Sequence, residues 1–154
     1  MAKSSKVKGR GSISRHDYFA EVAEARYVLR RVFRITEEQA REAGLDPLAH
    51  QALIQIYGSA DGRLRVAQLA ERLDITPAFA SSLLKSLGTD GMIDRHRDAD
   101  DHRVTWVSVT EQAIEKLVAI DAAVGFHVDY FAAQIPAKDR KRALATLKFY
   151  VGLG

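Results

Sequence analysis

Apolar residues between residues 76 and 89 repeat at the spacing of one helix face. They recur at i, i+3, i+4 and i+7, at Ala80, Leu83, Leu84 and Leu87. Thr76-Pro77 comes just before them. This pair suits a helix start, because the Thr hydroxyl can cap the first turn and Pro needs no N–H partner there. We therefore predict a helix from Pro77 that buries this apolar face.

The opposite face of the same helix is small, polar and cationic. It carries no carboxylate, and its residues are Ala78, Ser81, Ser82 and Lys85. Short side chains allow a close approach to a DNA groove, hydroxyls can bond bases or phosphates, and Lys can pair with a phosphate. The pattern favours a helix that reads duplex DNA. The alternative is a plain helical core hairpin followed by a surface β-hairpin.

The flanking segments predict a helix-turn-helix followed by a wing. Residues 64–73 read as a short strand and a helix, and Asp74 suits a left-handed turn into the next helix. Gly91 is expected to end the second helix in the same left-handed conformation. Gly88 is compatible with either an early helix end or a close backbone approach. Residues 93–97 and 104–109 then read as two strands. Trp106 is interpreted as a core anchor for this hairpin, with an aromatic wall for a ligand as the alternative.

Longer helices are predicted on both sides of this segment. They span about residues 15–43, 47–58, 111–134 and 137–151, and Pro136 separates the last two. The first has an apolar stripe that a small domain cannot easily bury alone, which suggests a partner helix from a second subunit. Residues 1–14 form a Lys-rich tail, which we interpret as a solvated disordered terminus rather than as an arm that contacts DNA.

Composition narrows the functional classes. The chain has 154 residues, which predicts one domain, and its net charge of +3 permits nucleic-acid binding without requiring it. It has no Cys, which excludes disulfides and thiolate metal sites. The sequence has no apolar run of the roughly 18 residues that a membrane span needs. No signal peptide is apparent. We expect a cytoplasmic protein without membrane contact.

No catalytic pattern is apparent. The five His residues include no pair at i, i+4, and the chain has no phosphate-binding Gly loop, nucleophile elbow or HExxH motif. His96 and His102 could approach each other beside the wing carboxylates, but solvated side chains are the favoured interpretation over a metal site. We expect neither an enzyme nor a bound cofactor or metal.

Residues 64–113 resemble the winged helix-turn-helix core of MarR-family transcription regulators. The resemblance is carried by Thr76-Pro77, Ser81, Gly91-Met92-Ile93, Asp101-His102-Arg103 and Thr110-Glu111. Two positions depart from the family pattern. Asp74 stands where Gly is frequent, and Ser82 stands where many members carry an Arg that contacts DNA. The operator sequence of a relative therefore cannot be transferred to this chain.

The resemblance implies a fold and a function. The fold would be mainly α with a small β-wing, in one domain of residues 15–154. Residues 46–110 would form the DNA-binding lobe, and residues 15–44 and 111–154 would form dimerisation helices. The protein would be a ligand-responsive homodimeric repressor that binds a near-palindromic operator in double-stranded DNA. The residues expected to face DNA are Thr76, Ala78, Phe79, Ser81, Ser82, Lys85, Arg95, Arg97, Asp101 and Arg103, where Asp101 holds the basic wing residues in place.

Two further hypotheses follow. In the resembled family, small aromatic or anionic effectors bind between the dimerisation helices and the lobe. By position, the candidates here are Tyr18, Arg26, Arg30, His50, Ile54, Tyr57, Phe126, His127 and Tyr130. Core aromatics and solvated arginines are the alternative. From another functional class, the chain could be a winged-helix protein-interaction module whose wing carboxylates, Asp94, Asp98, Asp100 and Asp101, face a basic partner.

Overall fold

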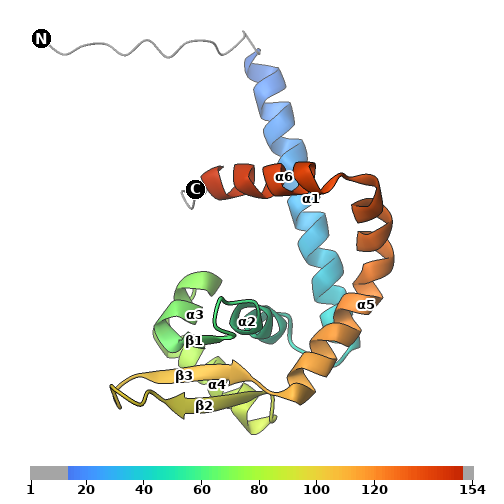
Figure 1. Cartoon of the computed structure of the whole chain (residues 1–154). Coiled ribbons are helices and arrows are strands. Elements are labelled where there is room, and N and C mark those ends of the chain that lie inside the picture. The colour runs from blue at the N-terminus through green and yellow to red at the C-terminus, as the bar shows by residue number, and fades with distance from the viewer. Residues whose placement is uncertain (1–13, 151–154) are drawn as a thin grey trace, which may run out of the picture. The chain divides into compact units, whose positions relative to one another are not determined.

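The computed structural model describes residues 14–150, except for the side chains of residues 126–134, 149 and 150. It is mainly helical, as expected (Figure 1). The elements are α1 (Arg15–Glu42), α2 (Pro47–Tyr57), β1 (Arg63–Arg65), α3 (Val66–Leu73), α4 (Pro77–Thr89), β2 (Ile93–Arg97), β3 (Thr105–Val109), α5 (Glu111–Gln134) and α6 (Ala137–Tyr150). The chain forms two units, residues 1–35 and residues 36–154. The predicted tail lies almost wholly outside the described residues.

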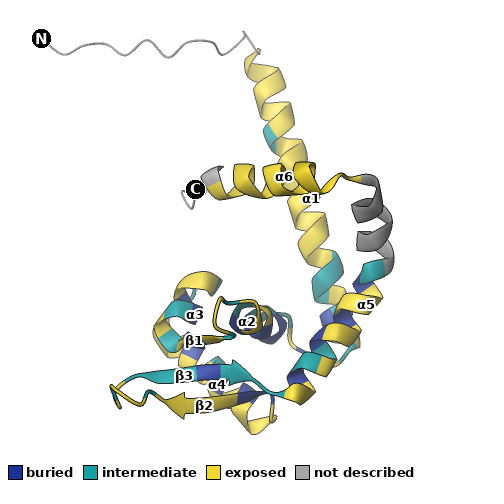
Figure 2. Ribbon diagram, viewed as in Figure 1, coloured by how far each residue is buried: buried dark blue, intermediate teal, exposed yellow. Residues whose placement is uncertain are grey.

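The core of the second unit is built around α2. Figure 2 shows buried residues where α2 meets the sheet, α3, α4 and the start of α5. Leu53 and Ile56 of α2 are completely buried. Other elements contribute the remaining large side chains whose exposed fraction is at most 2%. They are Leu69, Leu84, Leu87, Val107 and Ile120. Each element of the lobe therefore buries one face and leaves the other in solvent.

The sheet is antiparallel, with the strand order β1-β3-β2. Leu64 of β1 and Arg95 of β2 are both paired with Val107 of β3. Val107 is 1% exposed, whereas the rest of β3 is half-buried. Because alternate residues of a strand point to opposite faces, this register places Leu64 and Val107 on the face that packs against the helices.

Local capping explains where the lobe's helices begin. The Asp46 carboxylate accepts hydrogen bonds from the N–H groups of Leu48 and Ala49 at 2.9 and 3.1 Å. The Thr76 hydroxyl accepts one from the Phe79 N–H at 3.2 Å. In both helices Pro occupies the first turn. The predicted start of this helix, α4, at Thr76-Pro77 is confirmed.

Left-handed residues set where α3 and α4 end, as predicted. Asp74 has φ of 53° and Gly91 has φ of 69°. After each of them the chain folds back on the helix, and the Met92 N–H donates to the Leu87 carbonyl at 2.9 Å. Gly88 neither ends α4 early nor marks a close approach. A Cβ there would meet only Ile93, at an ordinary 3.9 Å.

His50 is a polar side chain inside this core. It lies on α2, is 4% exposed, and its Nδ1 has no hydrogen-bond partner. Burial lowers the pKa of His50, while the charge of Asp121 on α5 opposes this shift. The folded protein therefore holds the ring neutral at a pH at which the unfolded chain would protonate it. Stability is retained above the unfolded pKa of about 6.5 and is lost as the pH falls toward the lower folded pKa.

We predict that His50→Leu makes thermal unfolding less sensitive to acid. Leu fills a similar volume and cannot take up a proton. The difference in Tm between about pH 7.5 and about pH 5.5 should shrink in this variant. Calorimetry on both proteins measures this, and His16→Gln, which alters an exposed His, serves as the control. An unchanged pH sensitivity in His50→Leu would show that other groups dominate.

Candidate nucleic-acid interface

Helix α4 has the two faces that its sequence predicts. Ala80 and Leu84 are fully buried and Leu87 is 2% exposed, so this face is fixed in the core. The residues expected to face DNA are all exposed, namely Thr76, Ala78, Phe79, Ser81, Ser82 and Lys85. The structure thus places these six side chains together on the solvent side of α4 and its N-cap. Their contact with DNA stays a prediction.

The tip of the wing is organised by one carboxylate. Asp98 Oδ1 accepts hydrogen bonds from the N–H groups of Asp100 and Asp101, at 2.9 and 3.1 Å. Its Oδ2 accepts a hydrogen bond of 2.7 Å from the indole Nε1–H of Trp106. The Trp106 bond, followed by the two backbone bonds, holds the pKa of Asp98 below its ordinary value. Asp98 therefore stays ionised and closes the turn.

The same turn places Arg103. Asp101 Oδ1 accepts hydrogen bonds from the backbone N–H of Arg103 at 3.0 Å and from its Nε at 3.1 Å. The Arg103 side chain is 91% exposed and that of Asp101 is 45% exposed. An ion pair this exposed contributes under about 1 kcal/mol to stability. Its effect is orientation, because Asp101 holds the guanidinium through Nε and, at 3.5 Å, through Nη2, while most of the Arg103 side chain stays in solvent.

Trp106 does not anchor the wing in the core, so that interpretation was wrong. It is half-buried and lies on the face opposite Val107, which is the buried residue of β3. The guanidinium carbons of Arg63 and Arg65 lie 4.6 and 5.4 Å from the centre of the Trp106 ring. The indole therefore joins two arginines of β1 to Asp98 at the wing tip.

Sequence reasoning missed the contribution of Arg63 and Arg65. They flank the buried Leu64 in a strand of three residues, and both are exposed. The sequence feature that could have indicated this is the Arg-Leu-Arg alternation, which places both cations on the outer face of the sheet. Together with Trp106 they form a cation–π cluster, which stabilises this outer face by roughly 0.5–1 kcal/mol per exposed contact.

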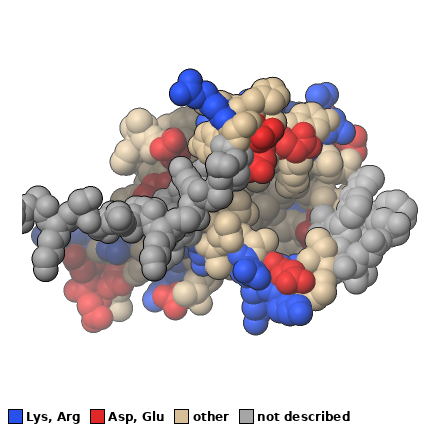
Figure 3. Space-filling model, turned by 90° about the horizontal axis from the view of Figure 1, so that it is seen from above, with Lys and Arg blue, Asp and Glu red and all other residues tan. Residues whose placement is uncertain are grey.

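The lobe, residues 46–110, has no excess of cations, because it contains seven Lys or Arg and nine Asp or Glu. Residues 63–109 contain seven Lys or Arg and seven Asp or Glu, while residues 1–13 contain four Lys or Arg and no acid. The tail thus accounts for the net charge of +3. Figure 3, a view from above that does not show the outer face of α4, also has Lys and Arg side chains beside Asp and Glu on the face that it draws. Any attraction of the lobe to DNA must therefore come from local placement of cations rather than from net charge.

The predicted effector residues are not brought into one described site. On α2, His50 is buried, whereas Ile54 and Tyr57 are 40% and 50% exposed. Three candidates on α1 belong to the other unit, and all three are exposed: Tyr18, Arg26 and Arg30. The side chains of Phe126, His127 and Tyr130 lie outside the described residues. An effector site at these residues stays a prediction.

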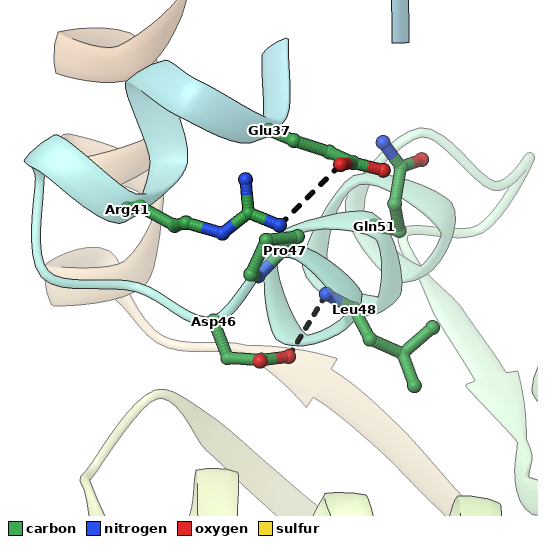
Figure 4. A pocket seen from close by; sticks show the side chains of 6 residues that line it. All are labelled: Glu37, Arg41, Asp46, Pro47, Leu48 and Gln51. Carbon is green, nitrogen blue, oxygen red and sulfur yellow. Dashed lines mark hydrogen bonds and ion pairs between the residues drawn. The ribbon is translucent and has the colours of Figure 1, made fainter. Parts of the chain in front are cut away.

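A shallow pocket lies elsewhere, between the end of α1 and the start of α2 (Figure 4). Its volume is about 260 Å³, and it is lined by Glu37, Arg41, Asp46, Pro47, Leu48 and Gln51. Arg41 pairs with Glu37 at 3.4 Å, and Asp46 is engaged as the cap of α2. No predicted effector residue lines this pocket. Its charged groups are already paired within the protein, so we assign no ligand to it.

Metal and membrane interpretations find no support in residues 14–150. Among the side chains that the structure describes there, which leave out residues 126–134, 149 and 150, no three His, Asp or Glu gather as metal ligands would. His96 instead lies 3.1 Å from the Ser108 hydroxyl, measured from its Nε2. None of the helices described combines the length and apolarity that crossing a membrane requires.

Comparison with known proteins identifies the fold. Residues 43–104 match the family model of the MarR family. The Staphylococcus aureus MepR–DNA complex is 19% identical, with a TM-score of 0.63 over 85% of this chain and 96% of that chain. S. aureus MepR in its DNA-binding conformation is 17% identical, with a TM-score of 0.72 over 86% and 96%. A mutant of Escherichia coli MarR is 15% identical, with a TM-score of 0.64 over 84% and 94%. No protein of curated function matches significantly. The winged helix-turn-helix fold is confirmed.

We predict that Asp98→Ala loosens the wing tip without unfolding the lobe. The amide protons of Asp100 and Asp101 lose their acceptor, so their hydrogen exchange should accelerate. Global thermal stability should remain almost unchanged, because the tip contributes no core residue. Amide exchange followed by NMR measures the first effect. Asp100→Ala, at an exposed carboxylate two residues away, is the matched control. Equal exchange in the two variants would mean that Asp98 does not hold the turn.

Proposed function

We propose that this chain, whose residues 43–104 match the model of the MarR family, is a transcription regulator of that family that binds specific double-stranded DNA as a homodimer. The observation that carries the proposal is the outer face of α4. This face is exposed, lined with hydroxyls and one Lys, and free of carboxylates. A wing follows it, whose Arg103 is held out into solvent by Asp101.

In this proposal α4 enters the major groove. Thr76, Ala78, Phe79, Ser81, Ser82 and Lys85 face bases and phosphates, because recognition helices contact base edges with their first turns. Arg95, Arg97 and Arg103 on the wing face the backbone and the minor groove, where a narrow groove concentrates negative potential. Support comes from the S. aureus MepR–DNA complex, a solved structure of the same fold.

The homodimer is proposed from exposed apolar side chains outside the lobe. On α1, Phe19, Tyr27, Val28 and Leu29 are between 43% and 61% exposed, and on α6 Leu144 and Leu147 are 54% and 49% exposed. Helices with so much apolar surface in water are expected to bury it against a partner. A second copy of the chain would supply that partner and would require a near-palindromic operator, with half-sites about one helical turn apart.

Regulation is proposed to be repression. A dimer that covers a promoter excludes the polymerase, and it would act in the cytoplasm, where its DNA lies, without enzymatic activity. A small aromatic or anionic effector would favour one spacing of the two recognition helices and so weaken binding. Repression and ligand response rest on the family resemblance.

A protein-interaction module is the second candidate, and the charge balance of the lobe favours it. The wing offers four carboxylates to a basic partner. Two of them are already engaged, however: Asp98 accepts hydrogen bonds from Trp106 and two backbone N–H groups, and Asp101 pairs with Arg103. That leaves Asp94 and Asp100, fewer charges than the wing cations that face DNA in the first proposal.

We predict specific binding to the duplex upstream of the protein's own gene. Fluorescence anisotropy should give nanomolar affinity for this duplex at about 200 mM salt, and affinity at least roughly a thousandfold lower for a scrambled duplex of equal length. The same comparison at about 50 mM salt separates base recognition from charge attraction. Equal weak binding to both duplexes that vanishes as salt rises would favour the interaction module.

Arg103→Ala should weaken DNA binding and leave thermal stability nearly unchanged. The side chain is exposed and makes a contact worth under about 1 kcal/mol to the fold, whereas a groove contact is worth roughly 1–3 kcal/mol to binding. Anisotropy and thermal unfolding measure the two effects. Arg41→Ala is the matched control, since Arg41 is also an exposed Arg paired with a carboxylate but lies on neither α4 nor the wing. Unfolding of Arg103→Ala would make Arg103 a structural residue.

A further inference from the structure

Phe79 is a large apolar side chain exposed on the recognition helix. It is 52% exposed in the first turn of α4, one position after Ala78, which is also exposed. The position is well defined, because the Phe79 N–H donates to the Thr76 hydroxyl at 3.2 Å and the next residue, Ala80, is completely buried. Rotation of the helix cannot hide the ring without exposing the core face of α4.

The polar groups of α4 leave base recognition incomplete. Between residues 76 and 89 there is no Arg, Asn, Gln, Asp or Glu. Apart from Lys, these are the side chains whose hydrogen bonds to base edges distinguish guanine, adenine and cytosine in the major groove. The serine hydroxyls can bond several bases and discriminate weakly. Lys85 lies more than two turns into the helix, where a phosphate is within its reach.

An apolar side chain can still recognise one feature of a base edge, the 5-methyl group of thymine. We propose that Phe79, with Ala78 beside it, contacts thymine methyl groups, so that each operator half-site carries thymine opposite the first turn of α4. This inference rests on the proposed function and narrows it to a class of operator. Phe79 is then a specificity-determining residue, and Lys85 contributes affinity without sequence preference.

The charge balance of the lobe supports this division of roles. With seven cations and seven anions in residues 63–109, electrostatic attraction to phosphate is modest, and discrimination depends on short-range contacts. Transfer of one methyl group from water to an apolar contact is worth about fourfold in affinity. Two symmetric half-sites would give roughly 15-fold when both methyl groups are removed.

The experiment first selects duplexes that bind the full-length protein from a random library. Each half-site thymine of the selected operator is then replaced by deoxyuridine, which removes the 5-methyl group and keeps the base pair. We expect about a fourfold loss of affinity per half-site at the position opposite the first turn of α4, measured by anisotropy. Replacement at other thymines should change little.

Two variants assign the effect to a residue. Phe79→Ala should bind the thymine operator more weakly and should show no further loss with deoxyuridine, whereas Phe79→Leu should keep the loss. Lys85→Ala, on the same helix face, should weaken binding to both duplexes equally and keep the full deoxyuridine loss. If Phe79→Ala fails to fold, the deoxyuridine series with the unaltered protein still decides whether a thymine methyl group is contacted opposite α4.

The outcomes separate this inference from the proposed function. If no sequence is enriched, the proposed function fails. An enriched operator without thymine opposite α4, or one that binds equally well with deoxyuridine, overturns the methyl contact and leaves DNA binding intact. A deoxyuridine loss that persists unchanged in Phe79→Ala also overturns the assignment to Phe79.

Discussion

The buried stripe of α4 is the constraint on which the candidate interface depends. Ala80, Leu84 and Leu87 are locked in the core around α2, and each residue of a helix is rotated by about 100° from the last. A slip of one residue would therefore turn part of this polar face toward the core. Burial on one side thus determines which side chains the other side presents, even though none of the presented residues contributes to the core.

The wing is ordered by a different kind of interaction. Its tip has no core to pack on, so Asp98 replaces burial with three hydrogen bonds, two to backbone N–H groups and one to Trp106. The resulting turn positions the Asp101 carboxylate, and this carboxylate positions the guanidinium of Arg103. Each link is weak in water, yet together they restrict where the guanidinium can be. Restricting a cation before it binds lowers the entropy lost when it meets a partner.

Local signals made most of the fold predictable. The caps at Thr76 and Asp46 and the left-handed Asp74 and Gly91 act over a few residues, so sequence alone placed the ends of the lobe's helices. Trp106 was assigned to the wrong face because both faces of β3 carry apolar residues, and only packing against α2 shows that Val107 is the buried one. The burial of His50 and the stacking of Arg63 on Trp106 likewise depend on contacts between elements that are distant in sequence.

The distribution of charge has a consequence for how such a lobe can discriminate between sequences. A strongly basic surface binds any duplex, and this non-specific affinity falls steeply with salt. Here the lobe has no excess of cations, and two of its wing carboxylates are used to close a turn and to orient an Arg. Little of the binding free energy can then come from phosphate attraction alone. In the proposed function, contacts that differ between base pairs must then supply a larger share of the binding free energy.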